Sequence, residues 1–451
     1  MNSKNDIIFN TDFFTVKIRK DPDAVTLLAL IPIKKAAVEI EHLNIEDFIV
    51  PETGEKIVIT RIGRRCFKHG SAPVFINKLT VGTSVTQITH AAFDSANIKV
   101  VVWPSNCYSI PKKCFANSSV EQVLNIEHVK YIGKGAFRCC TLLKTFQWPI
   151  ECKTIPFETF LSCTSLTEVN ETQGVEIVEG SAFANTINLG RIDMSSAIQI
   201  QNNAFLCSGV FQIKLSNNLT SIGEKAFRSS SLLSISIPDS VSYVGKEAFK
   251  ECRSLEFVKW SNSCDVINSS TFNKCTELTS IVGIERVSKI CSFAFASSGI
   301  ADFTIPNKVK VLEQGVFSEC RNLAYIHNIH NIDIIEAYAF SMSSLVEMAF
   351  PSCQIGEGVL QGCISLRKVY FTGEEIVIPK YFCQGCIHLK EVSGYENIIG
   401  IKEAAFSHTD IRNMDFSGAS LDFVERYAFE GVEEINFKPS FWTEISSLAF
   451  S

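Results

Sequence analysis

Residues 227–249 read FRSSSLLSISIPDSVSYVGKEAF, and the pattern within them predicts the fold of most of the chain. The segment LLSISI, residues 232–237, places apolar side chains in L-x-x-I-x-I order, and its end alternates like a short strand with one buried face. Pro238 follows at once and ends the strand, because proline has no backbone N–H to donate. Phe249 closes the phrase after a small residue, and we expect its ring to fill the space between the strand and the returning chain.

The same phrase recurs along nearly the whole chain. Its closing residue, the anchor, returns every 20 to 23 residues after a first step of 26. The eighteen anchors are Phe67, Phe93, Phe115, Phe137, Phe160, Phe183, Phe205, Phe227, Phe249, Phe272, Phe295, Phe317, Phe340, Leu360, Cys383, Phe406, Phe429 and Phe450. This period, with a strand-like leucine phrase, is typical of a leucine-rich-repeat solenoid. We expect a curved right-handed coil with a parallel β-sheet on its concave face and short turns or irregular structure on its convex face.

The repeat also predicts the domain organisation. Residues 61–451 form about eighteen repeats of 22–23 residues, the last of them incomplete. Residues 1–60 lack the phrase but contain strand-like segments such as AVTLLAL, so we expect an N-terminal β-rich cap that covers the first coil. The chain stops in the middle of a repeat, which leaves an apolar coil face and a strand edge uncovered. We therefore expect self-association through the C-terminal end.

Composition argues against several partners. The net charge is −6, acidic and basic residues are interspersed, and no basic block or stripe is visible along the sequence, so we expect no nucleic-acid partner. The longest apolar run, residues 25–33, is about half of a membrane span, so we expect no direct membrane span. The start, MNSKNDIIFN, has no apolar core after a basic segment and does not resemble a secretory signal.

The seventeen cysteines follow the repeat. Seven stand three residues after an anchor, where a thiol serves as a small buried spacer: Cys140, Cys163, Cys252, Cys275, Cys320, Cys363 and Cys386. We call these seven residues the cysteine ladder. Neighbouring coils bring them close to disulfide spacing, but we expect free thiols, because Ser and Thr take the equivalent position in other coils. The pair Cys383 and Cys386 forms a C-x-x-C without the second pair that structural zinc usually needs. We assign no metal, no cofactor and no catalytic residue.

The sequence resembles a known family. The order L-x-x-I-x-I-P, then V-x-x-I-G-x-x-A-F-x-x-C, is similar to the BspA-like leucine-rich repeat, and LLSISIPDSVSYVGKEAFKEC, ending at Cys252, is nearly its consensus. GIADFTIPNKVKVLEQGVFSEC, ending at Cys320, is another close copy, and the resemblance covers roughly residues 60–451. It implies a surface antigen or adhesin that binds host-cell proteins, extracellular-matrix proteins or other microbes. The family supplies no catalytic residue.

A ligand would be recognised by the variable side chains that point outward from the strands. Their densest group of interface-favoured side chains lies on three consecutive strands: Tyr325, His327, Glu347, Lys368 and Tyr370. Residues on adjacent strands are about 5 Å apart, so we expect these five to form one patch on the concave face.

Two functions fit the repeat. The first is a non-enzymatic protein-binding solenoid, a cell-surface adhesin or antigen that binds host or matrix proteins through its concave face. The second is an intracellular scaffold or receptor-like interaction module of the same fold. The resemblance favours a surface location, whereas the lack of a recognisable signal leaves a cytoplasmic one open.

Overall fold

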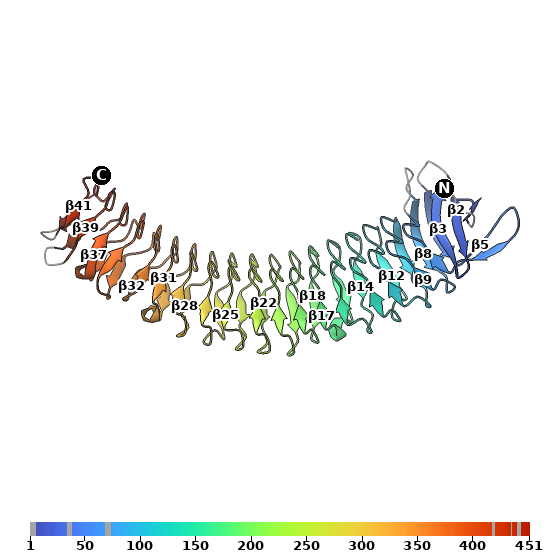
Figure 1. The fold of residues 1–451 in the computed structure, drawn as a ribbon, viewed down its shortest axis with the longest axis horizontal. Coiled ribbons are helices and arrows are strands. Elements are labelled where there is room, and N and C mark those ends of the chain that lie inside the picture. The colour runs from blue at the N-terminus through green and yellow to red at the C-terminus, as the bar shows by residue number, and fades with distance from the viewer. Residues whose placement is uncertain (1–5, 34–37, 68–73, 417–419, 434, 440–442) are drawn as a thin grey trace. The chain divides into compact units, whose positions relative to one another are not determined.

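The computed structural model describes residues 6–33, 38–67, 74–416, 420–433, 435–439 and 443–451. The chain forms two compact units, Met1–Leu232 and Leu233–Ser451. In each unit, strands stack coil upon coil in a parallel β-solenoid, and helix is limited to 3-10 turns among the described residues (Figure 1). The leucine-rich-repeat fold expected from the sequence is confirmed.

The N-terminal unit contains the 3-10 turn η1 (Thr172–Gly174) and the strands β1 (Asp6–Asn10), β2 (Phe14–Asp21), β3 (Ala24–Pro32), β4 (Val38–Ile45), β5 (Asp47–Ile49), β6 (Lys56–Val58), β7 (Arg61–Ile62), β8 (Val74–Val81), β9 (Gln87–Ile88), β10 (Ile98–Val102), β11 (Ser109–Ile110), β12 (Gln122–Leu124), β13 (Tyr131–Ile132), β14 (Thr145–Gln147), β15 (Thr154–Ile155), β16 (Glu168–Asn170), β17 (Ile177–Val178), β18 (Arg191–Met194), β19 (Gln199–Ile200), β20 (Gln212–Leu215) and β21 (Ser221–Ile222).

The C-terminal unit contains the 3-10 turns η2 (Ile329–Asn331) and η3 (Tyr395–Asn397) and the strands β22 (Ser234–Ser236), β23 (Tyr243–Val244), β24 (Phe257–Lys259), β25 (Val266–Ile267), β26 (Ser280–Val282), β27 (Lys289–Ile290), β28 (Asp302–Thr304), β29 (Val311–Leu312), β30 (Tyr325–His327), β31 (Ile334–Ile335), β32 (Glu347–Phe350), β33 (Gln354–Ile355), β34 (Lys368–Phe371), β35 (Ile376–Ile378), β36 (Glu391–Ser393), β37 (Ile398–Ile401), β38 (Asn413–Asp415), β39 (Phe423–Val424), β40 (Asn436–Lys438) and β41 (Glu444–Ile445).

The first sixty residues are β-rich, and their strands pair with strands on two sides of the solenoid. Strands β1, β2 and β3 form an antiparallel meander, and β3 then pairs in parallel with β7. Strand β4 pairs in parallel with β8, opposite Ile76 and Leu79, and so extends the ladder of leucine-phrase strands. The division of the chain at residue 60 stays a prediction.

The return path of each coil is more regular than the sequence suggested. In place of turns or irregular structure alone, most coils carry a second short strand, and these strands pair in parallel from coil to coil. The N-terminal unit shows this from β15 through β21, and the C-terminal unit shows it from β25 through β33 and from β35 through β41. Coils stacked at a constant pitch bring equivalent backbone groups together on every side, so those groups find partners there as well.

The anchor rings form a buried stack within each unit. Phe183 lies 5.4 Å from Phe160 and 5.1 Å from Phe205, between ring centroids, and Phe295 and Phe317 repeat the arrangement at 5.5 Å. Offset stacking in this distance range adds to the gain from burying apolar area. This aromatic column is present in both units.

Each anchor from Phe93 to Phe429 lies between two tight turns whose third residue is left-handed. Around Phe115, Lys113 has φ 56° and Asn117 has φ 60°. The N–H of Cys114 donates to the Pro111 carbonyl at 3.1 Å, which together with the positive φ defines a type II turn. The turns aim the N–H groups of Lys113, Phe115 and Asn117 at carbonyls of the next coil. The same pattern recurs at Leu360 and Cys383, which confirms Cys383, rather than Phe382, as the anchor of its coil.

The cysteine ladder has a hydrogen-bonding role that the sequence did not reveal. Ladder thiols donate to the anchor carbonyl of the preceding coil at 2.9–3.1 Å: Cys140 to Phe115, Cys163 to Phe137, Cys275 to Phe249, Cys320 to Phe295, Cys363 to Phe340 and Cys386 to Leu360. A thiol is therefore both spacer and weak donor. All seventeen cysteines are free in the structure.

The ladder thiols are expected to resist alkylation in the folded protein. Burial raises the pKa of Cys140 to about 12 and that of Cys320 to about 11. At pH 8 a thiol with a pKa of 12 is ionised about one time in ten thousand, and only the thiolate reacts quickly. Iodoacetamide should label the half-exposed Cys139 and Cys207 first, and all seventeen cysteines only after unfolding. Mass spectrometry without reductant checks this; any ladder pair that stays unmodified after denaturation would reveal a disulfide.

The parallel ladder formed by the strands of the L-x-x-I-x-I segments is interrupted within both units. Pairing is absent between β12 and β14 and between β16 and β18 in the N-terminal unit, and between β26 and β28, β30 and β32, and β36 and β38 in the C-terminal unit. The described strand before each of these breaks is followed by a left-handed residue, namely Asn125, Glu171, Gly283, Asn328 or Gly394.

The residue at this strand exit differs between coils whose strand pairs with the next and coils where the ladder breaks. Where the ladder continues within a unit, the same repeat position holds a buried apolar side chain, for example Trp103, Trp260, Ile305 or Phe350. A left-handed residue turns the backbone one position early, and the buried side chain then comes from the next residue, as at Ile329. The strand ends sooner and its edge is left without the neighbouring strand.

Candidate functional site

The five residues of the expected patch lie on three strands of the C-terminal unit. Tyr325 and His327 are exposed on β30, Glu347 is exposed on β32, and Lys368 and Tyr370 are half-buried on β34. The side chain of Tyr325 is 51% exposed, so it can contact a partner without any rearrangement of the core. The expected inward–outward register of these strands is confirmed.

Three of the five are joined by direct contacts. Glu347 lies opposite Lys368 in the ladder, and the Tyr370 hydroxyl donates to the Glu347 carboxylate at 3.3 Å. The Lys368 ammonium lies 4.7 Å from the centre of the Tyr370 ring and forms an ion pair with Glu391 on β36. The hydrogen bond to Glu391 is the main cause that raises the pKa of Lys368, so the lysine is positively charged at neutral pH. These contacts hold the aromatic ring and the two charges in fixed positions.

The other two residues pair toward the opposite side. The His327 imidazole lies 3.0 Å from the Asp302 carboxylate of β28, and Tyr325 stands opposite Asp302 in the ladder. The break between β30 and β32 separates this pair from the Glu347 cluster. Asp302 and Glu391 were not among the predicted residues. Their signal is positional, because both occupy the same outward repeat position as Tyr325, Glu347 and Lys368.

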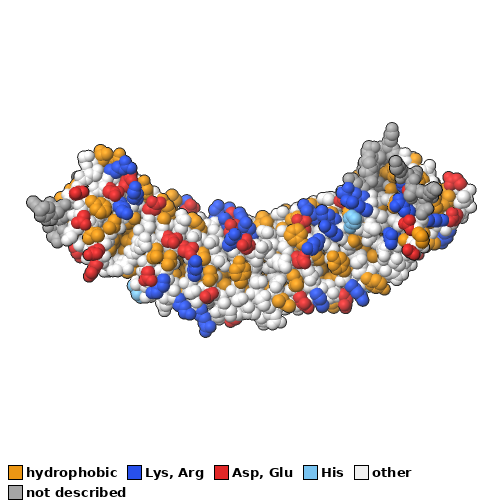
Figure 2. Space-filling model, in the orientation of Figure 1, with side chains coloured by type: hydrophobic (Ala, Val, Ile, Leu, Met, Phe, Trp, Pro, Cys, Tyr) orange, Lys and Arg blue, Asp and Glu red, His pale blue; other side chains and the backbone are white. Residues whose placement is uncertain are grey.

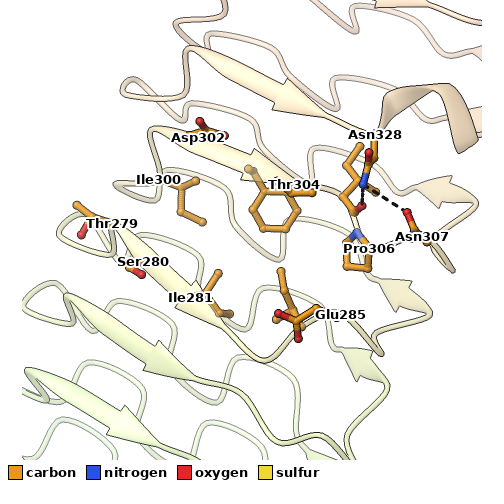
Figure 3. Close-up of a pocket in the computed structure, with 13 residues that line it drawn as sticks. Thr279, Ser280, Ile281, Glu285, Ile300, Asp302, Thr304, Pro306, Asn307 and Asn328 are labelled. Atoms are coloured by element: carbon orange, nitrogen blue, oxygen red, sulfur yellow. Dashed lines mark hydrogen bonds between the residues drawn. The ribbon is translucent and has the colours of Figure 1, made fainter.

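A pocket of about 470 Å³ opens at the break between β26 and β28. Figure 3 shows Ser280 and Ile281 on one strand and Asp302 and Thr304 on the next. Asn328 closes one end: its side-chain N–H₂ donates to the Ile305 carbonyl at 3.2 Å. Strand edges that face each other without pairing present backbone donors and acceptors to a ligand. This volume lies within the usual range of small-ligand sites.

The pocket and the patch are neighbours because Asp302 belongs to both. It lines the pocket and also pairs with His327. We call the surface made by the pocket and by Asp302, Tyr325, His327, Glu347, Lys368, Tyr370 and Glu391 the binding face. Its hydroxyl, carboxylate, ammonium and aromatic groups suit a polar protein surface, and its rigid strands hold them in place.

The described residues give little support to other chemistries. Among them, no group of three or more His, Cys, Asp or Glu side chains is placed to hold a metal ion. Cys383 and Cys386 of the C-x-x-C are both buried, and the Cys386 thiol is engaged with the Leu360 carbonyl. No helix in the described part of the chain is long and apolar enough to cross a membrane.

Comparison with solved structures gives the same fold. A leucine-rich repeat protein from Bacteroides ovatus is 22% identical, with a TM-score of 0.62 over 80% of this chain and 94% of that one. A leucine rich cell surface protein from Faecalibacterium prausnitzii is 18% identical, with a TM-score of 0.41 over 86% and 94% of the two chains. The pneumococcal vaccine antigen PcpA is 15% identical, with a TM-score of 0.31 over 99% and 100%. The first likeness shows the fold alone.

The family itself is shown by sequence. No curated protein matches the chain significantly. The family model described as BspA type Leucine rich repeat region (6 copies) matches residues 40–163, 130–256, 242–366 and 353–451. These matches cover well over half of the chain and agree with the coil-by-coil structure. The protein therefore belongs to the BspA type leucine-rich-repeat family, whose fold is a protein-interaction fold.

Proposed function

We propose that this protein is a non-enzymatic adhesin or surface antigen that binds host-cell or extracellular-matrix proteins through the binding face. The observation that carries the proposal is the cluster of Glu347, Tyr370 and Lys368, whose aromatic and charged groups are held on paired strands. A surface that is already ordered binds without a large entropy cost. Tyrosine is also enriched among interface hot spots.

The tyrosines test this proposal. Replacing Tyr325 and Tyr370 with alanine should weaken attachment to a matrix protein by more than about 1 kcal/mol, or roughly fivefold in Kd. The melting temperature should change little, because Tyr325 is exposed and Tyr370 is half-buried. Surface plasmon resonance against a panel of purified matrix proteins measures the binding.

A matched control keeps the number of lost tyrosines equal. Tyr131 on β13 and Tyr243 on β23 are exposed on return-path strands, one in each unit, and neither belongs to the binding face. Their double alanine variant should bind like the parent. If the Tyr325 and Tyr370 variant also binds like the parent, the binding face has no such role. If that variant unfolds, the two side chains are structural.

The second candidate is an intracellular scaffold of the same fold. The observation in its favour is the set of seventeen free thiols, which suits a reducing compartment. Biotinylation of intact cells distinguishes the two locations. The adhesin proposal expects a labelled protein, and labelling only after lysis supports the scaffold.

A further inference from the structure

A row of cations runs along the anchor turns of the N-terminal unit. The position three residues before the anchor holds Arg64, His90, Lys112 and Lys134 in four consecutive coils. Adjoining turn positions add three more, so that the basic ridge consists of Arg64, Arg65, His90, Lys112, Lys113, Lys134 and Arg138. All are exposed except Arg138, which is half-buried. Figure 2 shows Lys and Arg side chains, with a His beside them, along the loop edge above β12 and β14 of Figure 1.

The ridge exists because the coils stack. Its members at the same repeat position, Arg64, His90, Lys112 and Lys134, are 22 to 26 residues apart in the sequence. In the structure the N–H of Arg65 donates to the Ala91 carbonyl at 2.9 Å, that of Ala91 to Lys112 at 3.0 Å, and that of Lys113 to Lys134 at 3.0 Å. Neighbouring hydrogen-bonded chains lie about 5 Å apart, so the cations recur at that interval. The stripe is therefore a product of stacking and is not visible along the sequence.

Part of the ridge charge has no counter-ion among the residues that the structure describes. Arg65 pairs with the buried Asp94 at 3.0 Å, Arg138 with Glu158 at 2.7 Å, and Lys134 lies 4.0 Å from Glu179. Within the described ranges, no carboxylate forms an ion pair with Arg64, Lys112 or Lys113. These three side chains keep their positive charge available to a partner.

The shape of the ridge selects among anionic partners. Cations in a single file along the stack match a linear chain of negative charges. No ridge position holds an aromatic side chain on which bases could stack. The first aromatic residue at the same repeat position is Phe157, one coil after Lys134. Ala91, Ala92 and Ala116 between the cations are buried, so they offer no apolar group to insert into a membrane.

We propose that the basic ridge binds a linear sulfated polysaccharide that lies along the stack, with successive anionic groups facing successive coils. Rows of Lys and Arg are known features of heparin-binding surfaces. The site is separate from the binding face: it lies in the other unit, and it recognises charge and spacing rather than a protein surface.

Heparin chromatography of the whole chain tests the proposal. Lys112→Gln with Lys113→Gln should reduce affinity at low salt at least tenfold, and the slope of log K against log salt should fall by about two, one for each lost cation. The control is Lys274→Gln with Lys308→Gln in the C-terminal unit. Lys274 is exposed and left-handed, φ 60°, and so matches Lys113, φ 56°. The control should keep the parent affinity and slope.

The remaining outcomes are equally decisive. Equal loss in the ridge variant and the control would mean that heparin responds to total charge, which overturns the proposal. Stronger binding to a single-stranded oligonucleotide, or to phosphatidylserine vesicles, than to heparin would overturn it in favour of that ligand. Should the ridge variant lose its folded circular dichroism spectrum, Arg64→Gln with Lys134→Gln removes two exposed charges from the ridge and serves instead.

Discussion

Replacing Phe183 with alanine is expected to lower the free energy of unfolding of the N-terminal unit by about 3–5 kcal/mol, the usual cost of truncating a buried Phe. Its side chain is fully buried between the rings of Phe160 and Phe205, at 5.4 and 5.1 Å. The cavity would lie in the aromatic column that passes through every coil of the unit, where neighbouring backbones are tied by hydrogen bonds and cannot close in.

The matched control is Phe157→Ala. Phe157 is 41% exposed on the same solenoid, three residues before an anchor rather than at one, so its loss should cost about 0.5 kcal/mol or less. Urea unfolding measures the free energies. Hydrogen exchange should also show the greatest loss of protection in the coils beside residue 183, because each repeat contacts only its neighbours. Equal costs for the two variants would contradict the anchor role.

The architecture was predictable because one constraint repeats. A ring at each anchor, a small residue before it and an alternating strand phrase must recur at a constant spacing, since each coil buries its apolar face against the next. The same spacing identified Cys383 as an anchor although an aromatic residue precedes it. The hydrogen-bonding pattern at Leu360 and Cys383 confirms that reading.

The positions of the sheet breaks are marked in the sequence, although the sequence does not show that the strands fail to pair there. The residue five positions after the leucine is apolar in most coils, yet it is Asn125, Glu171, Gly283, Asn328 or Gly394 in five of them. Polarity and a tolerance for positive φ mark these positions. Their consequence could not be read, because whether two strands pair depends on both coils. The pocket beside β28 follows from one such break.

The candidate site was only partly accessible for a similar reason. Outward positions follow from alternation alone, and all five predicted residues lie where alternation places them. The link between Tyr370 and Glu347 could be expected from their positions on neighbouring strands. The separation at the break after β30 could not, because contacts also depend on rotamers and on which strands pair. The basic ridge shows the same limit, since charges far apart in sequence become neighbours only when coils are aligned.

The last prediction concerns aromatic side chains that lie over glycines of the next coil. Phe293 is left-handed, φ 58°, and a Cβ added to Gly315 would lie 2.3 Å from its ring. Tyr338 and Gly358 repeat the arrangement, at 2.4 Å. A bulky residue at positive φ is unusual, and the absence of a side chain on the next coil gives its ring a place to lie. The glycine and the ring should therefore depend on one another.

Gly315→Ala is accordingly expected to destabilise the C-terminal unit by about 2–5 kcal/mol, from about 1–2 for a left-handed alanine and about 1–3 for the clash. Gly385→Ala isolates the first contribution, because Gly385 has φ 74° and no atom nearer than 4.0 Å to its added Cβ. Adding Phe293→Ala to Gly315→Ala should remove the clash, so that in this background the glycine substitution costs no more than Gly385→Ala. Denaturant unfolding of the four variants and the parent completes the thermodynamic cycle. If Phe293→Ala brings no such relief, the ring can swing aside at little cost, and the pairing of aromatic residue and glycine along the anchor turns is not a constraint on this fold.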